Sequence, residues 1–251
     1  MIIVAYVMFF VMGVLMGPLY SLMDTTLLEY TDQLPEEMWA FVGASGGEMG
    51  TAEGFYEVET FGMTVPIAVM VVSITIGARA LAGEEANRTM GLLLANPIRR
   101  RKVVVEKTYA MVALTLSVGF ATWAGVWAGS LLGGLGMNPL NIAAASLLGS
   151  LVGLVFGALA LALSAAIGRV RVAASAAVGV AVVAYMINSI SILNDTVEGI
   201  AAFTPFDYYL TSDPLNNGMN WGHGAVLFAA FLVLIAAAVF LFDRRDLRQS
   251  G

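Results

Sequence analysis

The chain has 251 residues, of which 59% are hydrophobic and only 12% are charged, a composition outside the range of soluble globular domains. The formal net charge is −6. Cysteine is absent, which excludes disulfides and thiolate metal sites, and a single histidine, His223, excludes a multi-histidine metal site. Neither lysine, Lys102 or Lys107, follows a glycine, so the chain has no G-x-x-x-x-G-K-[ST] loop for binding nucleotide phosphates.

Six apolar stretches are long enough to cross about 30 Å of hydrocarbon as helices. Each is continuously apolar, whereas the strands of a membrane barrel alternate between lipid-facing and lumen-facing residues. The sequence therefore predicts an all-α integral membrane protein with one transmembrane domain over residues 1–251. The predicted spans cover residues 2–23, 60–82, 108–134, 142–168, 172–193 and 223–242.

The positions of the cations predict the orientation. All 12 Lys and Arg residues fall in alternate segments, within residues 79–107, 169–171 and 244–248. By the positive-inside rule these segments, including the loop 83–107 and both termini, are cytoplasmic. The outer loops are then 24–59, 135–141 and 194–222, and they contain acidic residues but no cation. Such a surface could concentrate cations or simply solubilise the protein.

The loop 83–107 predicts a short amphipathic helix that does not span the membrane. Glu84 and Glu85 suit the first turn of a helix, residues 92–94 are three leucines that form an apolar face, and Pro97 ends the helix. A basic run follows at residues 99–102. This helix could lie on the membrane surface with its basic residues on anionic lipid, or it could dock a cytosolic partner with the leucines as anchor.

Polar side chains occur in the second and fifth predicted spans. They could line a polar pathway or hydrogen-bond neighbouring helices; they are Ser73, Thr75, Tyr185, Asn188 and Ser189. No ionisable residue lies deep within a span, which argues against a self-contained proton-coupled transporter. Small residues recur every four positions in the third and fourth spans, at 121, 125, 129 and 133 and at 149, 153 and 157, which predicts close helix packing.

The segment 194–222 is broken by prolines before the sixth span. Pro205 and Pro214 divide it into short pieces, and its aromatic residues suit a membrane interface. We expect broken helices that cover the outer mouth of the protein.

These residues resemble the permease subunit of type-2 ATP-binding cassette (ABC) transporters, a six-span family of mostly prokaryotic exporters. The resemblance rests on residues 81–85, Thr89, 92–98, Arg100 and Lys107, which are similar to the pattern A-x-E-E-x-x-G-T-x-x-x-L-L-x-x-P-[VI]-x-R followed by a lysine. Further support comes from residues 34–35, 204–209, 214–215 and 242–247. Two positions depart from the pattern, because Arg88 stands where the family usually has glycine and Gly91 where glutamate is common.

The resemblance implies a mechanism. The loop between spans two and three is the coupling helix, which sits in a groove of a separate ATPase; its expected docking residues are Glu84, Glu85, Arg88, Thr89, Leu92, Leu93, Leu94, Pro97 and Arg100. Two permease chains pair, most simply as a homodimer, with two copies of the ATPase. Spans two and five line the route, which gives Ser73, Thr75, Tyr185, Asn188 and Ser189 a pathway role.

The resemblance also implies what the chain itself lacks. ATP and Mg are expected in the partner ATPase, so this chain binds no cofactor and is not an enzyme. Its expected surroundings are membrane lipid in a prokaryotic cytoplasmic (cell) membrane, with no nucleic acid. Two other functions stay open: a passive ion-conducting channel below the acidic outer surface, and a membrane anchor that recruits a cytosolic partner.

Overall fold

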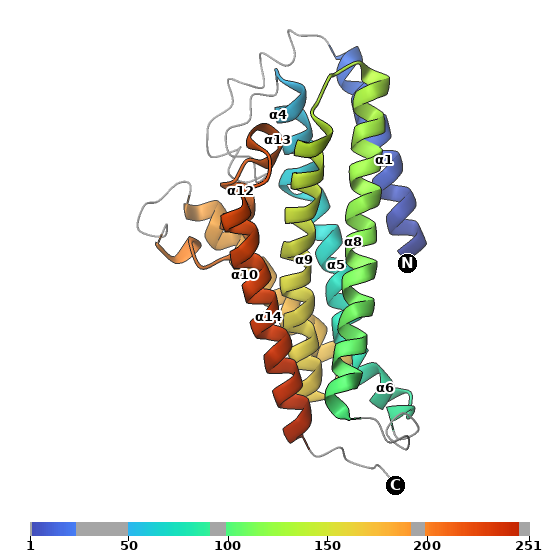
Figure 1. The fold of residues 1–251 in the computed structure, drawn as a ribbon, viewed down its shortest axis with the longest axis vertical. Coiled ribbons are helices and arrows are strands. Elements are labelled where there is room, and N and C mark those ends of the chain that lie inside the picture. The colour runs from blue at the N-terminus through green and yellow to red at the C-terminus, as the bar shows by residue number, and fades with distance from the viewer. Residues whose placement is uncertain (1, 24–49, 91–98, 192–198, 246–251) are drawn as a thin grey trace.

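The computed structural model describes residues 2–23, 50–90, 99–191 and 199–245, and every regular element within them is a helix (Figure 1). Five helical stretches in this part of the chain are long and apolar enough to cross a membrane, and α1 supplies a shorter apolar helix. The prediction of an all-α membrane protein with about six spans is therefore confirmed.

The helices form an elongated bundle (Figure 1). Their bounds are α1 Ile2–Leu22, α4 Ala52–Tyr56, η1 Glu57–Gly62, α5 Thr64–Ala80, α6 Ala82–Ala86, α8 Arg100–Gly133, α9 Pro139–Ile167, α10 Val170–Ser191, α12 Pro205–Leu210, α13 Pro214–Asn217 and α14 Trp221–Arg244. The first, fourth, fifth and sixth spans lie within a few residues of their predicted positions, whereas the second and third are longer than predicted.

The second span begins inside the predicted outer loop 24–59. α4, the π-helical turn η1 and α5 form one apolar helical stretch over Ala52–Ala80, which starts where Thr51 Oγ1 accepts a hydrogen bond from Gly54 N at 3.1 Å. The acidic residues of this stretch suggested a loop, but Glu57 is buried. Tyr56 fixes the stretch to α1, because its hydroxyl donates to Gly13 O at 2.9 Å.

The third span begins inside the predicted cytoplasmic loop 83–107. α8 starts at Arg100, well before the predicted Thr108, and has 34 residues. At about 1.5 Å per residue it is about 51 Å long, which exceeds the roughly 30 Å hydrocarbon layer. The extra helix length lies outside the hydrocarbon and contains a basic first turn. Because the helix dipole disfavours cations in a first turn, this part of the sequence resembled a loop.

α9 forms the centre of the bundle. It begins at Pro139 after the cap of Asn138 and ends at Gly168, which has φ 66°. In the most apolar 18 residues of α9, 72% are buried within the protein, whereas in the corresponding parts of α10 and α14 only 22% are buried. α9 packs against α5, α8, α10 and α14, while α1 lies on the outside of α8 (Figure 1).

Glycines bring α1 and α8 into backbone contact. A Cβ atom on Gly125 would lie 2.5 Å from Phe10 O, and one on Gly133 would lie 2.6 Å from Gly17 O. These distances confirm the predicted packing role of the small residues in the third span.

Short helices cover one end of the bundle before the last span, as the sequence predicted. α12 and α13 each begin at a proline, and α14 follows at Trp221. The hydroxyl of the buried Tyr209 donates to Phe61 O at 2.8 Å, which fastens α12 to the π-helical turn.

The opposite end of the bundle carries α6, the start of α8, and the ends of α9 and α14 (Figure 1). The described cations lie in these elements and the segments beside them. We call this end the basic end; it matches the end that the sequence predicts to be cytoplasmic.

Candidate functional site

The site is built around α6, at the basic end. α6 ends in a turn over residues 87–89, in which Arg88 has φ 59°, and the described chain continues to the buried Met90. Glycine adopts this left-handed conformation with less strain than arginine, which gives a physical reason for the glycine usual at this position of the pattern. The expected docking residues Leu92, Leu93, Leu94 and Pro97 lie outside the described residues.

Glu84 joins α6 to α8 and to its own turn. Lys107 Nζ donates to Glu84 Oε1 at 2.5 Å, and Thr89 Oγ1 donates to Glu84 Oε2 at 2.5 Å. The hydrogen bond from Lys107 is the main cause that holds the pKa of Glu84 below its usual value, and the bond from Thr89 adds to it. Glu84 is therefore a carboxylate that fixes the orientation of α6.

Glu85 joins α6 to the other side of the bundle. Its Oε2 accepts a hydrogen bond from Arg245, just beyond α14, and the two side chains are about one-fifth exposed. Arg245 Nη1 also donates to Ala165 O at 3.1 Å, near the end of α9. One guanidinium thus ties together α6, α9 and the end of α14.

Arg100 serves the end of α14 in the same way. Its Nη1 donates to Arg245 O at 2.7 Å and to Phe242 O at 3.2 Å, and its guanidinium lies 5.9 Å from the centre of the Phe242 ring. These carbonyls have no partner within α14, so Arg100 satisfies the end of that helix. This side chain is directed at α14 and is only partly exposed.

A buried serine secures the junction between α5 and α6. Ser164 Oγ donates to Ala78 O at 3.0 Å and accepts from Ala82 N at 2.9 Å. Leu81, between these two residues, is fully buried in an apolar cluster that also contains Phe242. α6 therefore cannot tilt without disturbing α5, α9 and α14.

One predicted side chain, Arg88, is exposed among the described residues, as are its neighbours Ala86 and Asn87. The acids Glu84 and Glu85 are engaged by cations of this chain, so they hold α6 in place while the turn after it stays accessible.

The two polar residues predicted in the second span, Ser73 and Thr75, lie in different surroundings. Ser73 is fully buried, lies against Gly157 of α9, and its Oγ has no hydrogen-bond partner among the described residues. Thr75 Oγ1 donates to Val71 O at 2.6 Å within α5. Thr75 lines a groove with Arg79 and Lys107.

The polar residues of the fifth span lie together near the end of α10. Ser189 Oγ donates to Tyr185 O at 3.1 Å, and the Tyr185 ring packs edge-on against Phe206, with centroids 5.3 Å apart. Asn188 is buried, and its Oδ1 has no partner among the described residues. A pathway role for the polar residues of α5 and α10 stays a prediction.

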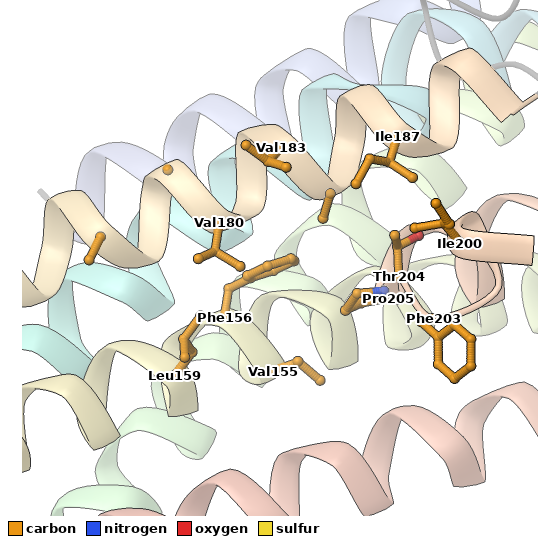
Figure 2. A pocket seen from close by; sticks show the side chains of 13 residues that line it. Val155, Phe156, Leu159, Val180, Val183, Ile187, Ile200, Phe203, Thr204 and Pro205 are labelled. Carbon is orange, nitrogen blue, oxygen red and sulfur yellow. The ribbon is translucent and has the colours of Figure 1, made fainter. Parts of the chain in front are cut away.

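An apolar groove of about 630 Å³ runs beside these residues, between α9, α10 and residues 200–205 (Figure 2). Phe156 and Leu159 of α9 face Val180 and Val183 of α10 across it, and Phe203 lies at its edge. None of the five predicted pathway residues lines this groove. The sequence carries no signal for this groove, because a uniformly apolar span does not distinguish a groove from a lipid-facing surface.

Three residues of the site were missing from the predicted set. Lys107 appears in the family pattern, but Ser164 lies 82 positions from its partner Ala82, and Arg245 lies 160 positions from its partner Glu85. Arg245 had a sequence signal in the family-like ending 242–247, whereas Ser164 had none among the other small residues of its span.

A comparison with known protein families shows the family of the chain. The family model described as "ABC-2 family transporter protein" matches residues 1–247. No curated protein sequence matches the chain. This family model covers nearly the whole chain, including α6 and the residues that bond to it. The chain therefore belongs to the ABC-2 transporter family as a membrane-spanning permease subunit.

Proposed function

We propose that this permease subunit belongs to an exporter of the prokaryotic cytoplasmic membrane that is driven by a separate ATP-binding cassette ATPase. Two permease chains, most simply two copies of this one, associate with two ATPase subunits, which bind ATP and Mg. The basic end faces the cytosol, as the positive-inside rule requires, and presents α6 and the segment after it to the ATPase. The chain itself contributes the route and not the hydrolysis.

The observation that carries this proposal is how α6 is held. Glu84 bonds to Lys107 of α8, Glu85 bonds to Arg245 beyond α14, and Ser164 of α9 bonds to both sides of the α5–α6 junction. A displacement of α6 by a partner would therefore reach four membrane helices. A segment that only rested on the lipid surface would not need these connections.

The family resemblance makes α5 and α10 the helices of the route, and one buried polar group of α10 supports this role. A buried polar atom without a partner costs about 1–3 kcal/mol, and Asn188 Oδ1 is one such atom among the described residues. A second permease chain or a passing substrate would supply its missing hydrogen bond. We propose that Asn188 acts with Ser73, Thr75, Tyr185 and Ser189 along this route.

The proposal is tested by reconstituting the chain with candidate ABC ATPase subunits from the same organism. We expect the two to co-purify and the permease to change the rate of ATP hydrolysis in proteoliposomes. Glu85→Lys should abolish that change, because it reverses the charge that faces Arg245. Glu106→Lys is the matched control, since Glu106 is exposed and its ion pair, at 3.8 Å, is with Lys102 of the same helix.

The other two functions predict different results. A passive channel would give ATP-independent conductance from the chain alone, and salt would reduce it by screening the acidic residues of the predicted outer loops. A membrane anchor would tolerate Tyr185→Leu and Asn188→Leu without loss of any coupled activity. Either result, together with no co-purification, would overturn the proposal.

A further inference from the structure

A second groove, of about 570 Å³, opens at the basic end beside the site. Its lining comes from α1, α5 and α8, and α1 lies against α8 (Figure 1). Ile3, Ile76, Ala80 and Ala110 form its apolar walls.

The groove contains two cations. Arg79, in the last turn of α5, is exposed and makes no hydrogen bond or ion pair within the described part of the chain. Lys107 lines the same groove and reaches Glu84, which does not line it. The remaining polar lining residue, Thr75, donates its hydroxyl to its own helix. No carboxylate belongs to the described lining, so the groove is positive.

The position of the groove selects its ligand. Arg79 stands at the end of a membrane-spanning helix, where the hydrocarbon meets the headgroup layer, and the apolar walls are on helices that continue into the hydrocarbon. A free anion would use the cations but not these walls. We propose that the groove binds an anionic phospholipid of the cytoplasmic leaflet, with its phosphate on Arg79 and Lys107 and its acyl chains along the apolar walls.

This site touches the docking element through one residue. Lys107 has three donors and shares them between Glu84 and the lipid phosphate. Because Glu84 offsets part of the lysine charge, removing the Glu84 charge should strengthen lipid binding. The proposal concerns this chain alone and is independent of whether an ATPase docks at α6.

The test is native mass spectrometry of the purified full chain with phosphatidylglycerol and with phosphatidylcholine. We expect tighter binding of phosphatidylglycerol, and Arg79→Gln should weaken it about fivefold, the contribution of one cation near an anionic headgroup. Arg101→Gln, an equal charge change at an exposed position outside the groove, should have a smaller effect. Millimolar inorganic phosphate should not displace the lipid.

A second pair of variants guards against misfolding as an explanation. Glu84→Gln should tighten phosphatidylglycerol binding several-fold, and Glu106→Gln, which frees a lysine outside the groove, should not. A gain of binding cannot come from a damaged fold. Equal binding of the two lipids, equal effects of Arg79→Gln and Arg101→Gln, no gain with Glu84→Gln, or displacement by phosphate would each overturn the proposal.

Discussion

At the residue scale, Arg88 holds a conformation that suits glycine. Its φ of 59° costs an L-residue about 1–2 kcal/mol. Arg88→Gly should therefore raise the thermal unfolding temperature in detergent by about 2–4 °C, less the entropy that glycine adds to the unfolded chain. Arg99→Gly is the matched control, since Arg99 has φ −67° and gains nothing from glycine. A similar shift in both variants would contradict this account.

Glu84 gives the site a defined dependence on pH. Its folded pKa lies below the ordinary 4.5, so its stabilisation is complete above pH 4.5 and is lost as the pH falls through the lower, folded value. Because the Glu84 side chain is partly exposed, this stabilisation is at most about 1 kcal/mol. The difference in unfolding temperature between wild type and Glu84→Gln should stay constant from pH 7 to pH 4.5 and shrink below it. A difference that shrank above pH 4.5 would count against the role of Glu84.

The sequence could predict Glu84 and Glu85 but not what holds them. A pair of acids before a leucine run is a local pattern, and it was visible without any structure. The bond from Arg245 to Glu85 joins residues 160 positions apart, and the two hydrogen bonds of Ser164 depend on how α9 rotates against α5. Long-range pairing of this kind leaves no local pattern in one sequence.

At the element scale, hydropathy predicted the number of spans but not their full length. Lipid requires apolar residues only over about 30 Å, so the helical ends that extend past it carry charge and resemble loops. Because of Glu57 and Glu59, the second span was predicted to begin too late in the chain, and the basic residues at 100–102 had the same effect on the third. When a helix is longer than the membrane is thick, hydropathy alone therefore predicts it to be too short.

The contact between α1 and α8 gives a prediction at this scale. Gly125→Ala places a methyl group 2.5 Å from the backbone of Phe10 and should destabilise the protein by about 1–3 kcal/mol, because two backbones must separate. Gly179→Ala, the same change in α10 where a Cβ meets nothing within 4 Å, should stabilise it by about 0.5–1 kcal/mol. Thermal unfolding of the two variants in detergent measures both effects. Equal stability would show that α1 does not depend on the glycines of α8.

At the scale of the whole molecule, α9 connects the two ends. At the basic end Ser164 and Ala165 bond to the α5–α6 junction and to Arg245. At the opposite end Asn141 Nδ2 donates to Leu215 O at 2.8 Å, which fixes α13 to the start of α9. The buried central helix thus joins α6 to the short helix α13, and a rigid displacement of α9 would move both.

This connection predicts that Arg245 transmits movement without contacting the ATPase. A spin label is placed at Leu140→Cys, because Leu140 is exposed at the start of α9 and the chain has no cysteine of its own. With the ATPase and ATP present, the distance from this label to the same label on the second chain should change. Arg245→Gln should abolish that change while the ATPase still binds, since Arg245 bonds to α6 and α9. Arg244→Gln is the control, because Arg244 packs on the Phe240 ring 4.0 Å away and joins no ion pair within the described residues.

The pair should also behave as one unit. If Glu85 and Arg245 act through their shared bond, the double variant Glu85→Gln with Arg245→Gln should lose no more of the distance change than either single variant. Additive losses would mean that each residue acts through separate contacts. A full response in Arg245→Gln would mean that α6 drives the other end through its remaining connections, which are α5 at Leu81, Lys107 of α8 and Ser164 of α9.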